Sequence, residues 1–168
     1  VRIFVRYRNK AGKSLRGLYI LRSQTNKASM SFFGNLFTHY QYSTTDLNFK
    51  TEGEALLVSS HQSDLDIAVE RGGVEIPLPP GSPFADWKEA RRYAGPLPFT
   101  FTYAPARKEV LIIEGVREHW IPEPVQVIRS HAGLMQDKRF EHAILANAFV
   151  VSHIPYYWKK GRTEQWPG

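Results

Sequence analysis

Histidine and carboxylate side chains come closest together along the chain at His61, Asp64 and Asp66. Asp64 and Asp66 are two residues apart on an expected strand, so their side chains share a face and could converge on a metal ion with His61. A turn followed by a polar outer strand face explains the same three residues. The other five histidines stand singly, at positions 39, 119, 131, 142 and 153. We therefore expect no metal site and no cofactor.

Motifs of the common catalytic folds are missing. The chain has no GxSxG nucleophile elbow, no GxxxxGK phosphate loop, no dinucleotide-binding fingerprint and no HExxH zinc motif. It contains no cysteine, which excludes disulfides and thiolate catalysis and fits a reducing compartment. Because the sequence shows neither an apolar run of transmembrane length nor a signal-peptide pattern, we expect a soluble cytoplasmic protein.

Positive charge is concentrated at the start of the chain. Residues 1–50 hold nine Lys or Arg and one acid, a net charge of +8, whereas residues 51–168 hold 13 bases and 15 acids, a net charge of −2. Alternation along an expected first strand gives one face of even-numbered residues, namely Arg2, Phe4, Arg6 and Arg8, and an opposite face of Val1, Ile3, Val5 and Tyr7. Three more cations, Lys10, Lys13 and Arg16, continue through a turn into a second strand at 15–21. The pattern predicts a basic-faced hairpin.

This hairpin has three interpretations. It can be a solvated outer sheet face, an anion-binding wall inside a barrel, or a footprint for a phosphate backbone.

The clearest order of elements lies between Phe84 and Val127. Helix formers at 86–93 are followed by Gly95-Pro96, which predicts the end of a helix. Residues 99–103, FTFTY, alternate with period two, and VLII at 110–113 is apolar throughout. We expect a helix followed by an antiparallel hairpin.

Strands dominate our expectation for the rest of the chain. A helix at 26–37 has Met30, Phe33 and Phe37 on one apolar stripe, and Gly34 within it permits a close contact. Strands are expected at 40–49, 54–61, 64–69, 125–130 and 149–157, with a short helical stretch near 138–146. The fold class that follows is mainly β (α+β), and the length favours a single domain over 1–168.

Several stretches together resemble one protein family. They are VRIFVRYR, the aromatic helix that ends FFGNLF, the strand pair GPLPFTFTY and VLIIEGVREHW, and the following IPEPVQV. They look like an uncharacterised bacterial family, domain of unknown function 2071, which is grouped with the acetoacetate-decarboxylase-like superfamily. The resemblance covers most of the chain. It implies a single-domain antiparallel β-cone or barrel with a few peripheral helices, a ligand-sized cavity, and a missing segment before Val1.

The decarboxylases of that superfamily form a Schiff base through a lysine that is activated by desolvation and an adjacent cation. Their lysine pair follows the helix that resembles residues 26–37, where this chain reads THYQY at 38–42. Because no lysine stands there, the resemblance does not carry the imine chemistry to this chain. His39 is then the best candidate acid or base, since the pKa of a free histidine is about 6.5 and its side chain can exchange a proton near neutral pH.

Around the implied cavity we expect five ligand-binding residues, namely Arg2, Tyr40, Tyr42, His119 and Trp120. Arg2 would hold a carboxylate, the tyrosines would orient a carbonyl, and His119-Trp120 resembles a turn of the family. Each also has a structural interpretation, because Arg2 can pair with an acid, His39 can cap the preceding helix, and the aromatic rings can belong to the core.

Two functions of different classes remain. The first is a small-molecule-binding β-cone protein, which includes an enzyme acting on a small carboxylated or carbonyl ligand without lysine Schiff-base chemistry. The second is a basic module that grips nucleic acid or another acidic polymer through the N-terminal hairpin. We favour the first, because the resemblance turns Arg2 toward an interior cavity, and we expect neither strong nucleic-acid binding nor a membrane partner. The sequence does not decide whether the protein forms a homo-oligomer. Cations that share one open surface would favour the second function.

Overall fold

The computed structural model describes residues 1–38, 40–73, 75–93, 97–152 and 155–166. Strands predominate among them, so the prediction of a mainly β protein is confirmed. The strands form several separate sheets, and none of the sheets in these ranges closes into the expected barrel. No helix in the same ranges is long and apolar enough to cross a membrane.

Contacts divide the chain into two compact units, which are described separately. Unit 1 consists of residues 1–44, 96–120 and 153–168, and unit 2 consists of residues 45–95 and 121–152. Each unit is therefore assembled from segments that lie far apart in the sequence.

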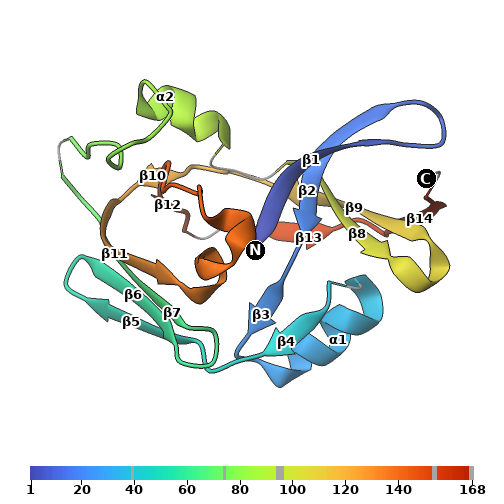
Figure 1. Cartoon of the computed structure of the whole chain (residues 1–168), viewed down its shortest axis with the longest axis horizontal. Helices are drawn as coiled ribbons and strands as arrows, with labels where there is room; N and C mark the ends of the chain where they lie inside the picture. Colours follow the sequence, from blue (N-terminus) through green and yellow to red (C-terminus); the bar gives the residue numbers. More distant parts are fainter. Residues whose placement is uncertain (39, 74, 94–96, 153–154, 167–168) are drawn as a thin grey trace. The chain divides into compact units, whose positions relative to one another are not determined.

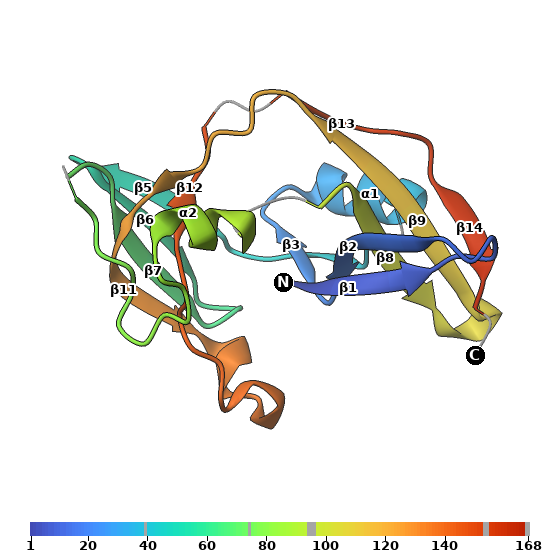
Figure 2. The same cartoon turned by 90° about the horizontal axis from the view of Figure 1, so that it is seen from above.

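A six-stranded sheet forms the frame of unit 1 (Figures 1 and 2). Its strands follow the order β1-β2-β8-β9-β13, and β14 also pairs with β9. The strands are β1 (Arg2–Arg8), β2 (Ser14–Ile20), β8 (Phe99–Ala104), β9 (Glu109–Arg117), β13 (Tyr156–Trp158) and β14 (Arg162–Gln165).

Both hairpins expected in this sheet are present. β1 pairs with β2 in antiparallel fashion over its whole length. β8 pairs antiparallel with β9, with Thr100 opposite Ile113, and the single 3-10 turn Pro105–Arg107 joins the two strands. β2 and β8, in contrast, run parallel, so the sheet is mixed and not purely antiparallel as expected.

The sheet of unit 1 buries side chains on both of its faces. One apolar cluster consists of Tyr7, Leu15, Phe101, Val110 and Ile112. The other cluster consists of Ile20, Tyr40 and Ile113. Ile112 and Ile113 are neighbours on β9, and the two-residue period of a strand sends them to opposite faces, where they are 1% and 2% exposed.

Helix α1 (Ala28–Thr38) lies between the short parallel strands β3 (Ser23–Thr25) and β4 (Tyr42–Thr44). It contacts β4 through a polar face: the Ser31 hydroxyl and the Asn35 amide donate hydrogen bonds of 3.0 and 2.9 Å to the Tyr42 carbonyl. Gly34 permits this approach, because a Cβ atom there would lie 2.5 Å from the Tyr42 ring.

Two residues of the apolar stripe predicted for α1, Met30 and Phe33, are exposed, and the side chain of the third, Phe37, lies outside the description. Met30 and Phe33 are 50% and 55% exposed, and Phe32 beside them is 68% exposed. The helix was therefore located correctly from its pattern, but the side that docks is the polar one.

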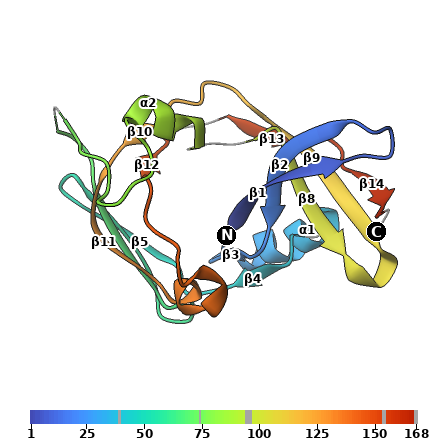
Figure 3. The ribbon, with the colours of Figure 1, turned by 45° about the horizontal axis from the view of Figure 1, so that its top comes forward.

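Unit 2 is built on a four-stranded antiparallel sheet in the order β11-β7-β6-β5 (Figure 3). These strands are β5 (Asn48–Glu52), β6 (Ala55–Ser60), β7 (Leu65–Glu70) and β11 (Gln126–Ala132). A two-residue pair joins β10 (Glu123–Pro124) to β12 (Phe149–Val150). The ring of Phe149 meets Trp87 edge-on at 5.2 Å between centroids.

Helical structure in unit 2 is shorter than predicted. The helix expected at 86–93 is α2 (Trp87–Ala90), capped by Asp86, followed by the 3-10 turn η1 (Arg91–Tyr93). The stretch expected near 138–146 contains only the 3-10 turn η4 (Lys138–Phe140), which follows another 3-10 turn, η3 (Gly133–Gln136). Gly95-Pro96, the expected stop signal, lies outside the described residues.

Two long predicted strands are also divided. The strand expected at 40–49 is split into β4 and β5, and the one expected at 149–157 into β12 and β13, with residues 153–154 outside the described ranges.

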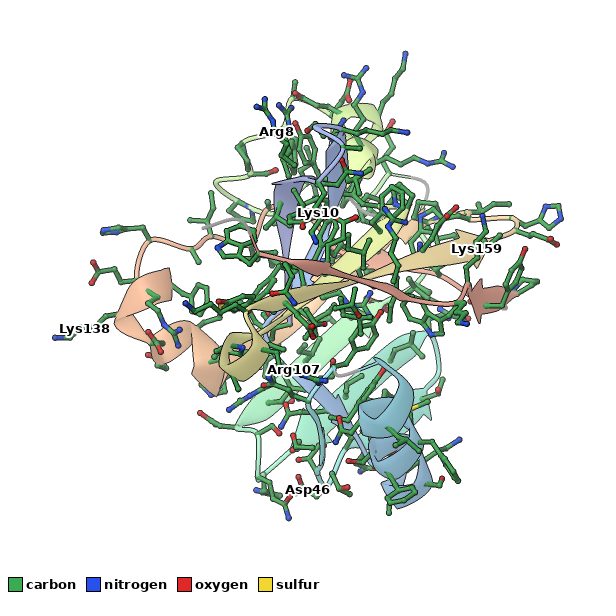
Figure 4. The ribbon with its side chains drawn as sticks, turned by 90° about the vertical axis from the view of Figure 1, so that its right-hand side faces the viewer. Arg8, Lys10, Asp46, Arg107, Lys138 and Lys159 are labelled. Atoms are coloured by element: carbon green, nitrogen blue, oxygen red, sulfur yellow. The ribbon has the colours of Figure 1, made fainter. Side chains whose placement is uncertain are left out.

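Asp46 explains the first of these interruptions (Figure 4). One of its carboxylate oxygens accepts hydrogen bonds from the Ser60 hydroxyl and the Gln62 backbone N–H, and the other accepts from the His61 N–H. The hydrogen bond from Ser60 is the largest cause that lowers the pKa of Asp46 to about 2, and the two N–H groups add to it. The segment between β4 and β5 is thus tied to the turn between β6 and β7 by an ionised carboxylate.

Because the pKa of Asp46 falls from 3.8 to about 2 on folding, its stabilising effect is present above pH ~4 and is lost as the pH falls toward 2. We predict that Asp46→Asn lowers the melting temperature at pH 7 and loses less stability than wild type between pH 4 and 2. Thermal melts followed by circular dichroism measure both. Glu75→Gln, at an exposed site, is the control and should follow wild type, and identical pH profiles for wild type and Asp46→Asn would contradict the assignment.

Gly17 tests the packing of unit 1. A Cβ atom at this position would lie 2.4 Å from Phe101 Cε2 and 2.5 Å from the Phe99 carbonyl oxygen, on the neighbouring parallel strand. We predict that Gly17→Ala lowers the free energy of unfolding by about 1–3 kcal/mol, the usual cost of overpacking. Urea titration measures this loss. The exposed Ser14→Ala on the same strand should change it by less than about 0.5 kcal/mol, and an unchanged Gly17→Ala would refute the close packing of β2 on β8.

Candidate ligand-binding site

A cavity of about 390 Å³ lies within unit 1 on the face of the sheet that carries Tyr7 and Phe101. It is lined by Val5, Arg6, Tyr7, Tyr19, Phe101, Tyr103, Val110 and Trp166. Five of these eight residues are aromatic. The alternation of side chains along a strand explains why these rings lie together, because residues two apart on β1 and on β8 project to the same side of the sheet. The volume falls in the range of about 300–1,000 Å³ that is typical of small-molecule sites.

Trp166 supplies a wall of the cavity from the end of the chain. β14 pairs with β9, and immediately after it the backbone N–H of Trp166 donates a 2.7 Å hydrogen bond to the Lys108 carbonyl. The indole stacks on Tyr7 at 5.9 Å between ring centroids and meets Tyr103 edge-on at 6.1 Å. Trp166 is 45% exposed, so it forms the outer side of the aromatic group.

A carboxylate beside the cavity fixes the Tyr7 ring. The Tyr7 hydroxyl and the Lys10 backbone N–H donate hydrogen bonds of 3.2 and 3.1 Å to Glu164 Oε2. Burial opposes ionisation of Glu164, but the hydrogen bonds from Lys10, Tyr7 and Arg162 outweigh it and hold its pKa below the ordinary value. Burial and the bond to Glu164 raise the pKa of Tyr7. Tyr7 therefore stays neutral, and its hydroxyl group donates its hydrogen bond to Glu164.

Besides Arg6, which also lines the cavity, its remaining polar groups are two other hydroxyls. Within the described part of the chain, the hydroxyls of Tyr19 and Tyr103 have no hydrogen-bond partner, so both can bond a polar group of a ligand. The lining holds no histidine, carboxylate or lysine among these residues. Such a surface suits binding and stacking better than proton transfer.

Three of the expected ligand-binding residues come together on the opposite face of the sheet. The rings of Tyr40 and Tyr42 are 6.0 Å apart, and Arg2 acts electrostatically on Tyr42, where it partly offsets the rise in pKa caused by burial. Tyr40 is only 4% exposed, and its hydroxyl forms a hydrogen bond with the Thr100 hydroxyl, so it belongs to the core. The side chain of Arg2 is exposed.

The other expected site residues are placed elsewhere. His119 and Trp120 follow β9, where His119 has φ +56° and the Arg117 guanidinium lies over the Trp120 ring at 6.0 Å. His39, the candidate acid or base, lies outside the described residues.

The carboxylates considered for a metal ion have separate partners. Asp64 lies 2.9 Å from His131 Nε2, and Asp66 accepts two hydrogen bonds from the Arg129 guanidinium. Among the described residues no group of three or more His, Asp or Glu side chains could hold a metal ion.

Trp166 and Tyr103 are functional candidates that the sequence interpretation missed. Phe101 and Tyr103 were recognised as one strand face, but the sequence does not reveal that a space remains between their rings. β14 was not predicted, because Arg162–Gln165 is polar throughout. The Trp that follows this polar segment was the available signal.

No protein-family model, curated protein or solved structure matches this chain. The assignment of a function therefore depends on the residues of the site alone.

Two lysines elsewhere in the chain, Lys50 and Lys159, have neighbouring carboxylates. Lys159 Nζ donates to Glu114 at 2.8 Å, and Lys50 pairs with Glu52. In each case the hydrogen bond to the carboxylate raises the pKa of the lysine, the opposite of what an imine-forming amine requires.

We predict that borohydride in the presence of acetoacetate traps no adduct on this protein. Protonated amines are poor nucleophiles, so the intact mass should stay unchanged, while an acetoacetate decarboxylase treated in parallel gains the reduced adduct. A mass shift that peptide mapping assigns to any lysine would contradict this interpretation.

Proposed function

We propose that unit 1 is a small-molecule-binding β domain whose ligand occupies the aromatic cavity. The observation that carries the proposal is the lining of this cavity: five aromatic rings, two valines and Arg6 around about 390 Å³. Most small-molecule sites have this composition, in which a largely apolar wall supplies affinity and a few polar groups set orientation.

The ligand chemistry follows from the groups that remain available. Trp166, Tyr19 and Tyr103 offer ring surface to the cavity, which favours a flat, unsaturated or aromatic body. The hydroxyls of Tyr19 and Tyr103 can donate to a carbonyl or carboxylate oxygen. Because the Tyr7 hydroxyl already donates to Glu164, it is not part of this recognition. The proposed ligand is therefore a flat, mostly apolar molecule with one carbonyl or carboxylate group.

The proposal includes membership of the domain of unknown function 2071 family and its acetoacetate-decarboxylase-like fold. A ligand-sized cavity on a β sheet is what that resemblance implies, and it supports the proposal. The cavity that we propose lies on the sheet face of Tyr7, whereas the resemblance implied a site around Arg2, Tyr40 and Tyr42. Binding, without catalysis, is the function assigned to it.

The ligand can be identified by mass spectrometry of protein purified under native conditions. A second measurement after denaturation gives the mass of the protein without its ligand, and the difference is the mass of the ligand. A bound aromatic carbonyl or carboxylate compound is the expected result.

Site occupancy is tested with the fluorescent probe anilinonaphthalene sulfonate. We predict that wild-type protein binds the probe with enhanced emission, and that Trp166→Ala combined with Tyr103→Ala weakens binding at least about tenfold, because ring contacts of ~1.4 kcal/mol or more are lost. Emission titration measures the affinity.

Two variants control this titration. Tyr157→Ala removes an aromatic ring of unit 1 that does not line the cavity and is 54% exposed, and Phe32→Ala removes a ring of the exposed α1 stripe. Both should retain wild-type affinity. Loss of binding in Phe32→Ala, with full binding in the double variant, would place the probe on α1 and refute the proposal. Because loosely folded states also bind this probe, near-ultraviolet circular dichroism checks that every variant is folded.

A further inference from the structure

The β1–β2 hairpin carries six exposed cationic side chains, namely Arg2, Arg6, Arg8, Lys10, Lys13 and Arg16. Arg8 and Lys10 mark its outer end in Figure 4. None of the six forms an ion pair with a carboxylate among the described residues. We call the surface of Arg2, Phe4, Arg6, Arg8 and Arg16, which share one side of the hairpin, the basic hairpin face. Of these residues, Arg6 also borders the cavity.

The register of the hairpin places like charges against each other. Arg6 stands directly opposite Arg16, and Arg8 follows on the same face of β1. Side chains opposite each other on antiparallel strands lie about 5 Å apart, and like charges in this position destabilise the pair. The arrangement therefore does not serve the stability of the hairpin, and a bound anion would relieve the repulsion.

The nearest acid does not neutralise this face. Glu164 lies beside the hairpin, but it accepts hydrogen bonds from the Lys10 backbone N–H, the Tyr7 hydroxyl and the Arg162 guanidinium. None of these donors is a side chain of the basic hairpin face. Glu164 belongs to the face of the sheet that holds the cavity, since it stands opposite Val110. The positive charge on the other side of β1 stays uncompensated.

An aromatic ring interrupts the row of cations. Phe4 is 49% exposed and lies between Arg2 and Arg6 on the basic hairpin face. Residues two apart on a strand are roughly 6.6 Å apart, so successive guanidinium groups and the ring form a regular row. Cations that contact phosphates, with a ring on which a base stacks, are the combination that binds single-stranded nucleic acid.

We propose that the basic hairpin face binds single-stranded nucleic acid, as a second activity that does not depend on the aromatic cavity. The expectation of no strong nucleic-acid binding assumed that Arg2 faces an enclosed cavity, whereas its side chain is exposed. An acidic peptide would use the charges but not the ring, and it is therefore the less suitable partner.

The test is fluorescence anisotropy with a labelled oligothymidylate of roughly 15 nucleotides, within the usual site size. Wild-type protein should bind at low salt, with a slope of log affinity against log salt of about −2 to −3, as expected for three or four phosphate contacts. Arg8→Gln combined with Arg16→Gln should weaken binding about tenfold and reduce the slope by about 1.4. Phe4→Ala should weaken binding without changing the slope.

Matched variants decide whether the effect is local. Arg91→Gln with Arg92→Gln removes the same charge from the exposed turn η1 of unit 2 and should bind like wild type. Absence of binding at low salt, or equal loss in both double variants, overturns the proposal. Binding to phosphatidylserine vesicles or polyglutamate that equals or exceeds binding to the oligonucleotide also overturns it. Neither Arg8 nor Arg16 lines the cavity, so the fluorescent probe should still bind the Arg8→Gln/Arg16→Gln variant.

Discussion

Ile112 and Ile113 lie side by side on β9 and are buried on opposite faces of one sheet, and the rest of unit 1 depends on this two-sided burial. Both edges of β9 are also paired, with β8 on one side and with β13 and β14 on the other. A strand with both faces and both edges covered must be apolar and regular, which is why VLII stands at its centre. The aromatic cavity is built against one of its faces.

The sheet separates two different environments. On one face, rings from β1, β2 and β8 surround a space, and Glu164 fixes the orientation of Tyr7 at its side. On the other face, Tyr40 is part of the core and forms a hydrogen bond with Thr100, and Tyr42 of β4 packs against the same cluster. A tyrosine in each place looks alike in the sequence, yet one ring borders a cavity and the other is packed on all sides.

Local sequence patterns correctly predicted the strands whose side chains alternate with a period of two residues. The alternation at 1–8 and 99–103 and the apolar run at 110–113 identified both hairpins of unit 1, because register follows from which face is buried. The orientation of α1 could not be predicted, since its docking depends on Gly34 and on two hydrogen bonds to Tyr42, from a separate strand. β14 is polar, so only its pairing with β9 makes it a strand. The cavity depends on how closely the side chains pack in three dimensions, and a residue pattern does not predict this.

β1 contributes to both proposed activities, and among the residues named for them only Arg6 borders both surfaces. Tyr7 projects to the cavity side, whereas Arg8 next to it projects to the basic hairpin face, because successive residues of a strand point to opposite sides. Glu164 binds both the Tyr7 hydroxyl and the backbone of Lys10, so it holds the ring and the end of the hairpin in one hydrogen-bonded group. The opposite side of β1 carries arginines that form no ion pair among the described residues. The same strand can therefore present an aromatic wall to a small apolar molecule and a row of cations to a phosphate backbone.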